Sequence, residues 1–128
     1  MASGKVFGVP ERDALPYAVA TELFHSATIV LDDLPSMDDS DLRRGKESCH
    51  NKFGVATAEL CSHYLYQRGR LLMEELDLDD RRKSRISSAT SRTALRLIRG
   101  QEKDLYELER DVSLLDLFAF YKFLRVWV

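Results

Sequence analysis

The sequence has few of the residues that build disulfide frameworks, zinc sites or long flexible loops. Its 128 residues include two cysteines, three prolines, six glycines and one tryptophan. Cys49 and Cys61 are too few for a disulfide framework, and no second cysteine–histidine pair stands at the spacing of a zinc site. We therefore expect a reducing compartment.

Long apolar runs and a strong charge of one sign are absent as well. No apolar run of 18 residues is free of charge, and the N-terminus lacks the apolar core of a signal peptide. The sequence therefore predicts no transmembrane segment and a cytoplasmic location; an organellar location would imply that a targeting segment was removed. The net charge of −2 gives no overall attraction to nucleic acid or membrane, and 45% hydrophobic residues exclude wholesale disorder. The length fits one domain over residues 1–128.

Residues 32–54 combine acidic and basic groups in one segment. Five aspartates precede two adjacent arginines, Arg43 and Arg44, which are followed by His50. Mg²⁺ takes one or two carboxylates together with water and phosphate oxygens, whereas guanidinium groups bind phosphate through paired hydrogen bonds. The combination predicts a site for a diphosphate carried on metal. The alternative is an acidic loop that ends a helix.

The preceding residues predict a helix that ends at the first two of these aspartates. Residues 15–31 are largely apolar, Pro16 suits a first helical turn, and no glycine interrupts the run. We expect a buried helix with Asp32 and Asp33 at its C-terminal end, where the helix dipole is unfavourable for carboxylates. A metal ion would compensate for this.

Pro35 predicts what the chain does next. It disfavours helical geometry at the residue before it. We therefore expect a bulge that brings Asp38 or Asp39 back over the first aspartate pair.

The rest of the chain predicts helices and no convincing strand. Residues 53–76 form one expected helix with Gly69 as its weak point, because glycine costs up to about 1 kcal/mol relative to alanine in a helix. Residues 77–80 form an expected exposed turn between helices. Residues 81–99 contain seven lysines or arginines and no acid, which predicts a basic amphipathic helix with either a solvated or a membrane-facing side. The expected apolar side of the first of these helices contains Ala56, Leu60, Tyr64, Leu71 and Leu72.

The last stretch, residues 113–128, is apolar on more than one face. Phe118, Tyr121, Leu124 or Trp127 would need to be covered, which indicates self-association or a partner.

The motif 32–39 (DDLPSMDD), with DLRRG at 41–45 and Cys-His at 49–50, resembles the first aspartate-rich region of the trans-isoprenyl diphosphate synthases. Gly100-Gln101 with Asp104-Leu105 is similar to the GQxxDL signature of that family. The resemblance implies an all-α, antiparallel helix bundle that corresponds to part of the isoprenoid synthase fold. It implies Mg²⁺-dependent condensation of isopentenyl diphosphate with an allylic diphosphate.

The resemblance also implies roles for individual residues. Small side chains at Ala27 and Thr28 imply a product of twenty or more carbons. Lys122 matches a diphosphate-binding position, although the family's following threonine is absent. The implied ligands of Mg²⁺ are Asp32, Asp33 and Asp38; the implied contacts of isopentenyl diphosphate are Arg44 and His50; Arg43 faces the allylic diphosphate; and Gln101 and Asp104 lie near the reaction centre.

The second aspartate-rich motif of the family, near DDxxD, is not reached before Val128. We therefore expect a single partial domain over residues 1–128 that is inactive alone. A non-catalytic subunit that binds and modulates a full-length synthase is the alternative. Either hypothesis predicts a homo- or hetero-oligomer.

Overall fold

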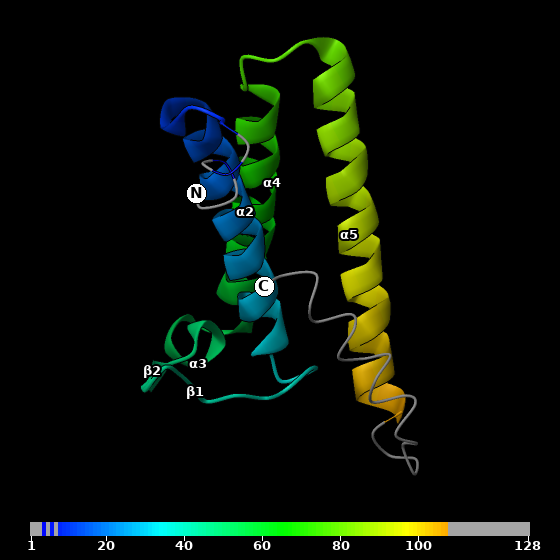
Figure 1. Ribbon diagram of the computed structural model, residues 1–128. Helices are drawn as coiled ribbons and strands as arrows, with labels where there is room; N and C mark the ends of the chain where they lie inside the picture. Colours follow the sequence, from blue (N-terminus) through cyan, green and yellow to red (C-terminus); the bar gives the residue numbers. More distant parts are fainter. Residues whose placement is uncertain (1–3, 5, 7, 108–128) are drawn as a thin grey trace. The chain divides into compact units, whose positions relative to one another are not determined.

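The computed structural model describes residues 4, 6 and 8–107, and the chain divides into two compact units, Met1–Lys83 and Ser84–Val128. The first unit holds helix α2 (Glu11–Asp32), strands β1 (Leu42–Arg43) and β2 (Lys46–Glu47), helix α3 (Cys49–Phe53) and helix α4 (Val55–Glu74) (Figure 1). Helix α5 (Asp80–Glu107) begins in the first unit and supplies the described part of the second. The predicted all-α class is confirmed, while the single partial domain over residues 1–128 stays a prediction.

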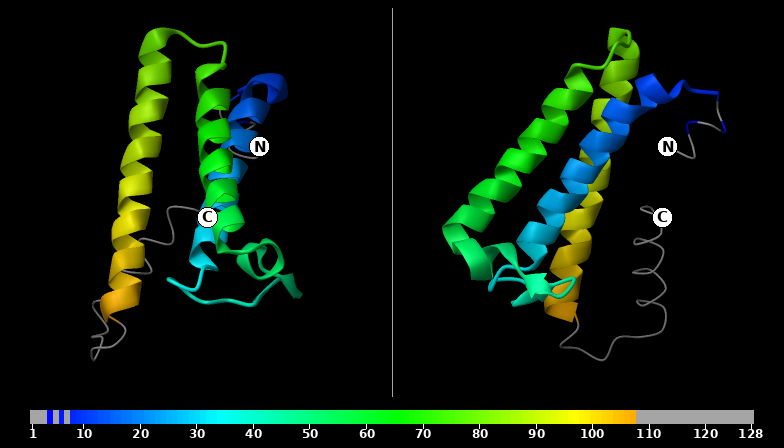
Figure 2. Two further views of the ribbon diagram at one scale, coloured as in Figure 1. Left: turned by 180° about the vertical axis from the view of Figure 1, so that it is seen from behind. Right: turned by 90° about the vertical axis from the view of Figure 1, so that its left-hand side faces the viewer.

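Helices α2 and α4 lie side by side and run antiparallel (Figures 1 and 2). The Ser62 hydroxyl on α4 donates a hydrogen bond of 2.8 Å to the backbone carbonyl of Ala27 on α2. One turn further along, the rings of Phe24 and Tyr66 have their centroids 5.0 Å apart and are tilted by 57°. Positions that ascend on α4 thus meet positions that descend on α2, which is the register of an antiparallel pair.

Gly69 allows the closest approach of the two helices. A Cβ atom at this position would lie 3.0 Å from Phe24 Cε1 and 3.1 Å from the Ala20 carbonyl oxygen. The second contact is with backbone, which cannot rotate away. The sequence predicted Gly69 as a weak point of the helix, and its propensity cost is real. In the structure, however, the same residue is what lets α2 pack against α4.

The apolar side that the sequence predicted for α4 is the wrong one. Leu60, Tyr64 and Leu71 are 70%, 69% and 46% exposed. The buried residues of α4 are Ala58, Ser62, Gly69 and Met73. Because a close approach needs small side chains, α4 turns its small residues toward α2, and the large apolar side chains lie outside. Ala56 is also exposed, and Leu72 is half-buried.

Helix α2 is likewise less buried than predicted. Its buried residues are Ala20, Phe24 and Ala27, which recur at helical spacing, whereas Leu15 and Tyr17 are 50% and 44% exposed. Of the helices in the described ranges, α2 is the one long and apolar enough to cross a membrane by length and composition. Core helices of soluble proteins and signal sequences pass the same test, so that length and composition alone are weak evidence for a membrane span.

A bend at Gly54 divides the helix that was predicted over residues 53–76. Gly54 has φ 86°, a left-handed value that glycine adopts without a steric penalty. Its N–H donates to the His50 carbonyl (2.8 Å), and its own carbonyl accepts from the Ala58 N–H (3.1 Å). Gly54 therefore ends α3 and starts α4 at one residue, and the chain changes direction there.

The connection into α5 confirms the predicted turn over residues 77–80. The Asp79 carboxylate accepts a hydrogen bond of 2.9 Å from the backbone N–H of Arg82, as a helix N-cap does. The Lys83 ammonium donates to the Glu74 carbonyl at the end of α4 (2.9 Å). The predicted basic helix lies within α5. Five of its arginines, which recur at helical spacing along one side, are all exposed: Arg81, Arg85, Arg92, Arg96 and Arg99. The apolar residues predicted to need a partner, Phe118, Tyr121, Leu124 and Trp127, lie outside the described residues.

Candidate functional site

The first two aspartates of the motif lie at the C-terminal end of α2. Asp32 is the last helical residue, and Asp33 is the C-cap, with its N–H bonded to the Ile29 carbonyl at 3.1 Å. The Asp33 side chain is buried, and Asp32 is half-buried. Both carboxylates are therefore close to the negative end of the helix dipole, as the sequence predicts.

The chain after Pro35 returns to this helix end. The Asp38 N–H donates to the Asp32 carbonyl at 2.9 Å, and the Ser40 N–H donates to the Asp33 carbonyl at 3.2 Å. Asp39 has φ 48°, a left-handed conformation that aspartate tolerates better than most residues. The expected bulge is thus present in the backbone, with Asp38 next to Asp32 and both Asp38 and Asp39 exposed.

A short hairpin follows, which the sequence analysis did not predict. Strands β1 and β2 pair antiparallel with Leu42 opposite Glu47 and Arg43 opposite Lys46. Arg44 and Gly45 form the turn, and both have positive φ, 52° and 76°. This is the pattern of a two-residue type I′ hairpin, for which a glycine after a polar residue is the sequence signal. The turn places the Arg44 side chain at an exposed tip.

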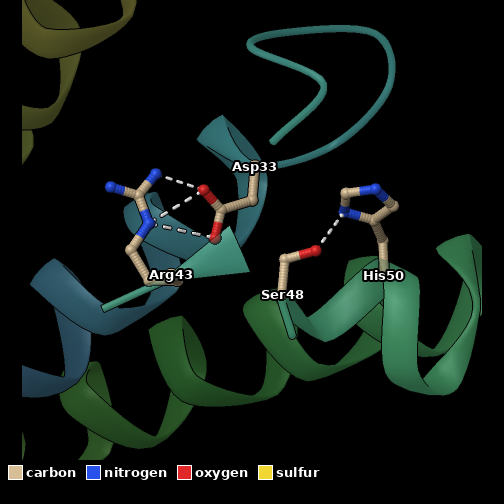
Figure 3. Close-up of polar contacts among 4 residues, drawn as sticks. All are labelled: Asp33, Arg43, Ser48 and His50. Atoms are coloured by element: carbon tan, nitrogen blue, oxygen red, sulfur yellow. Dashed lines mark hydrogen bonds and ion pairs between the residues drawn. The ribbon is translucent and has the colours of Figure 1, made fainter. Parts of the chain in front are cut away.

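The hairpin places the Arg43 guanidinium against Asp33. Arg43 Nε donates to Asp33 Oδ1 at 2.9 Å and to Oδ2 at 3.2 Å, and Nη2 also donates to Oδ1. Figure 3 shows the guanidinium facing the carboxylate edge-on. The Asp33 side chain is 3% exposed and that of Arg43 is 42% exposed. A buried carboxylate is therefore covered by a cation that still reaches solvent.

The charge around Arg43 comes from all three predicted metal ligands. The hydrogen bond to Asp33 is the main cause that raises the pKa of Arg43, and the negative charges of Asp33, Asp38 and Asp32 raise this pKa further, against an opposing effect of burial. The guanidinium thus lies within the electrostatic reach of the three aspartates. The Arg43 guanidinium therefore serves as a shared counter-charge for Asp32, Asp33 and Asp38.

Ser48 orients His50. The Ser48 hydroxyl lies 3.1 Å from His50 Nδ1, and Ser48 itself is buried, with its N–H bonded to the Asp41 carbonyl at 2.9 Å. Nδ1 faces Ser48, and the other ring nitrogen, Nε2, points away from Ser48, as Figure 3 shows. Ser48 was not among the residues predicted from the sequence, although a serine immediately before a short helix is a typical N-cap signal.

The predicted metal ligands have the right chemistry but are not gathered into one cluster. Within residues 4, 6 and 8–107, no group of three or more His, Cys, Asp or Glu side chains could hold a metal ion. Both oxygens of Asp33 are bonded to Arg43. The carboxylates of Asp32 and Asp38 fit the usual mode of Mg²⁺, which needs one or two protein carboxylates with water and phosphate oxygens.

The remaining predicted site residues lie elsewhere. Ala27 is buried against α4, and Thr28 is half-buried with its hydroxyl bonded to the His25 carbonyl at 2.9 Å. Gln101 and Asp104 lie on α5, in the second unit, and both are half-buried. Lys122 lies outside the described residues. The roles of these residues stay predictions.

Comparison with known proteins identifies the family. The chain matches the family model described as polyprenyl synthetase over residues 1–125. It is 38% identical over 109 residues to the farnesyl diphosphate synthase of Escherichia coli (strain K12), covering 81% of this chain and 36% of that protein. It is 43% identical over 60 residues to the heterodimeric geranylgeranyl pyrophosphate synthase large subunit 2 of Arabidopsis thaliana, covering 47% of this chain and 16% of that protein.

A solved structure gives the same result for the fold. The geranyltransferase of Legionella pneumophila matches with a TM-score of 0.87 and 30% identity, over 91% of this chain and 43% of that chain. The chain thus spans less than half the length of these relatives. The predicted correspondence to part of the isoprenoid synthase fold is confirmed. On the family match, this chain belongs to the polyprenyl synthetase family.

Proposed function

We propose that this chain supplies the first diphosphate-binding half of an isoprenyl diphosphate synthase site. The observation that supports this most directly is the Arg43 guanidinium, which binds buried Asp33 and lies in the field of Asp32 and Asp38. A cation that is half-exposed above three carboxylates is placed to turn toward a phosphate group when a second cation takes over the carboxylates. Arg44 and His50, on the segment that directly follows, add further phosphate contacts.

The proposed reaction joins isopentenyl diphosphate to an allylic diphosphate. The allylic C–O bond breaks and diphosphate leaves, a new carbon–carbon bond forms to isopentenyl diphosphate, and one proton is lost. Mg²⁺, when bound, would act as a Lewis acid that neutralises the departing diphosphate. Asp32 and Asp38 would hold it. Arg43 would bind the allylic diphosphate, and Arg44 with the Nε2 side of His50 would bind that of isopentenyl diphosphate.

Binding of diphosphate tests this proposal without requiring turnover. Isothermal titration of the full chain with inorganic pyrophosphate should give binding that depends on Mg²⁺. The double variant Asp32→Asn/Asp38→Asn should lose the dependence on Mg²⁺, and Arg44→Gln should weaken pyrophosphate binding about tenfold or more, the effect of a lost charge-assisted hydrogen bond. The matched control is Arg70→Gln, an exposed arginine on α4. Equal losses in Arg44→Gln and Arg70→Gln would contradict the site.

Condensation by the chain alone is a separate question. The facing aspartate-rich motif predicted for the family has no counterpart in residues 1–128, so we propose that the chain alone turns over little or no substrate. Radiolabelled isopentenyl diphosphate with an allylic primer and Mg²⁺ measures this. Robust product, lost in Asp32→Ala, would overturn the proposal of inactivity and leave that of the site standing.

A non-catalytic subunit is the second candidate, and the outward side of α4 favours it. Leu60 and Tyr64 are 70% and 69% exposed one helical turn apart. One relative is named as a subunit of a heterodimeric synthase. We propose that this side of α4 packs against a second prenyl-synthase chain, in a homo- or hetero-oligomer. Light scattering measures the mass in solution of the wild type and of Tyr64→Glu. We expect an oligomer for the wild type and a monomer for Tyr64→Glu, whereas a monomer for both would contradict association through α4.

Product length is proposed from Ala27 and Thr28, whose small side chains favour twenty carbons or more. Ala27 is 2% exposed and packed against α4, so that a large side chain there would disturb the fold. Thr28 is half-buried and therefore the better position to test. In a complex that turns over, Thr28→Phe should shorten the product.

A further inference from the structure

Four exposed arginines form a basic stripe along one side of α5, within the second unit: Arg85, Arg92, Arg96 and Arg99. Helix α5 is continuous from Asp80 to Glu107 (Figure 1). At 3.6 residues per turn, the four positions fall within about 60° of the helix circumference, and they extend over about 21 Å of its length. Charges arranged in a line of this kind can all contact one flat partner at the same time.

The basic stripe has no compensating charge along its own part of the helix. Residues 81–99 contain no Asp or Glu. The first acids that follow, Glu102 and Asp104, lie on either side of the stripe, about 90° or more from its centre around the helix. Five other arginines form ion pairs in the described part of the chain, whereas the four stripe arginines form none with a described acid. The stripe is thus complementary in charge to an anionic surface.

Two exposed aliphatic side chains border the basic stripe. Leu95 and Ile98 are 57% and 65% exposed. Leu95 follows Arg92 by three residues and precedes Arg99 by four, so it lies next to both on the helix surface, and Ile98 lies three residues after Leu95. Cations in a row with aliphatic side chains at their edge are typical of a helix that lies in a membrane interface, where the cations meet phosphate groups and the apolar residues enter between headgroups.

The same surface suits nucleic acid less well. Residues 81–105 contain no Phe, Tyr or Trp on which a base could stack. Contact with a phosphate backbone would also leave the exposed Leu95 and Ile98 without an apolar environment. The combination of charge and aliphatic side chains therefore favours a lipid surface.

We propose that the basic stripe of α5 binds the surface of a membrane that contains anionic phospholipids, with Leu95 and Ile98 inserted between the headgroups. The helix would lie on the membrane without crossing it. Because none of these residues belongs to the diphosphate site, membrane binding is independent of the proposed function.

Vesicle co-sedimentation tests membrane binding with the full chain. One set of vesicles contains equal parts of phosphatidylglycerol and phosphatidylcholine, and the other contains phosphatidylcholine alone. We expect binding to the anionic vesicles that weakens as the NaCl concentration rises, and at least about tenfold weaker binding to the neutral vesicles. Equal binding to the two sets, or binding to neither, would overturn the proposal.

Two triple variants with the same loss of charge separate the stripe from the overall charge of the chain. Arg85→Gln/Arg92→Gln/Arg96→Gln should bind the anionic vesicles at least about thirtyfold more weakly, since each basic residue near such a surface contributes a factor of about five. The control should change the affinity by less than about threefold. It replaces three exposed arginines outside α5, in Arg12→Gln/Arg68→Gln/Arg70→Gln. Equal losses in the two variants would overturn the role of the stripe.

Further variants test the chemistry of the contact, with circular dichroism to confirm that each keeps its helices. Arg85→Lys/Arg92→Lys/Arg96→Lys keeps the charge and should retain binding to within about threefold. Leu95→Ser/Ile98→Ser should keep the salt dependence and bind the anionic vesicles about tenfold more weakly, because two aliphatic side chains no longer enter the headgroup region. An unchanged affinity of this double variant would overturn the insertion of Leu95 and Ile98.

A nucleic-acid probe distinguishes the other class of anionic partner. Fluorescence anisotropy with a labelled single-stranded oligonucleotide, at the salt concentration of the vesicle experiment, should show weaker binding than the anionic vesicles do. Tight binding of the oligonucleotide that is lost in Arg85→Gln/Arg92→Gln/Arg96→Gln, together with no sedimentation by anionic vesicles, would overturn the membrane proposal in favour of nucleic acid.

Discussion

Arg43 donates hydrogen bonds to both carboxylate oxygens of Asp33, and so joins the first strand of the hairpin to the end of α2. The two partners are unequally buried, with 3% of the Asp33 side chain exposed against 42% of Arg43. Loss of either partner therefore has different consequences. The carboxylate cannot return to water without moving the chain, whereas the guanidinium can.

This asymmetry predicts that Arg43→Ala destabilises the protein more than Asp33→Ala. The first change leaves a buried carboxylate without its partner and should cost about 2–3 kcal/mol, while the second frees an arginine that reaches solvent and should cost about 1 kcal/mol. Urea denaturation of the two variants measures the difference. Arg44→Ala, at the exposed tip of the same hairpin, is the control and should cost less than about 0.5 kcal/mol.

Mg²⁺ should partly rescue Arg43→Ala. Without the guanidinium, three aspartates that share its field would repel one another, and a divalent cation would relieve this. We expect Mg²⁺ to raise the Tm of Arg43→Ala by several degrees more than that of the wild type. An identical shift in both proteins, measured by thermal denaturation at constant ionic strength, would show that the carboxylates do not attract Mg²⁺.

Ser48→Ala should weaken pyrophosphate binding through His50. The Ser48 hydroxyl lies 3.1 Å from His50 Nδ1, and its removal leaves the ring free to rotate. We expect a loss of about threefold to tenfold in affinity, the size of one neutral hydrogen bond. Ser48→Thr, which keeps the hydroxyl, should restore part of the loss, and the exposed Ser36→Ala should change nothing. Broadening of the His50 ring resonances in Ser48→Ala would report the lost orientation independently of affinity.

The sequence was sufficient for the features that depend on local chemistry. The apolar run predicted the helix before Asp32, and Pro35 predicted the return of Asp38 toward it. The prediction that Pro16 lies in the first helical turn was wrong, because α2 begins at Glu11 and Pro16 lies inside it. The turn predicted over residues 77–80 leads into α5, whose start the Asp79 carboxylate caps. Each of these follows from the preference of a few neighbouring residues, without knowledge of what they pack against.

The features that depend on partners distant in sequence were not predictable in the same way. Leu60 and Tyr64 suggested an apolar side for α4, but the contact with α2 selects the opposite side because Gly69 and Ser62 permit a closer approach. Similarly, the pairing of Arg43 with Asp33 depends on a hairpin turn at Arg44 and Gly45 that a search for apolar alternation does not detect. Strands of two residues, such as β1 and β2, are too short to show an alternation of apolar and polar residues.

Gly69→Val should destabilise the contact between α2 and α4. The added side chain meets Phe24 and the backbone of Ala20, with a Cβ distance of 3.1 Å to the Ala20 carbonyl oxygen. Overpacking of this kind costs about 1–3 kcal/mol, even though valine has a better helix propensity than glycine. Gln67→Val is the control, because Gln67 is exposed on the same helix. This substitution should lower the free energy of unfolding by only about a few tenths of a kcal/mol. Equal losses of unfolding free energy would mean that α2 does not pack closely at Gly69.

Stability should fall at alkaline pH through Cys49. Burial raises the pKa of the Cys49 thiol, and the neighbouring Cys61 and Asp33 raise it further. As the pH rises above about 8.5, the unfolded chain loses this thiol proton before the folded chain does. The contribution of Cys49 is therefore fully present below that pH and is lost as the pH rises toward the folded pKa.

Urea denaturation of the reduced chain between neutral pH and pH 10 checks this. The difference in unfolding free energy between the wild type and Cys49→Ser should shift against the wild type above about pH 8.5. Cys61→Ala should weaken the pH dependence, because the Cys61 side chain is one of the causes that raise the Cys49 pKa. Parallel pH profiles of the wild type and Cys49→Ser would mean that the Cys49 thiol ionises alike in the folded and the unfolded chain.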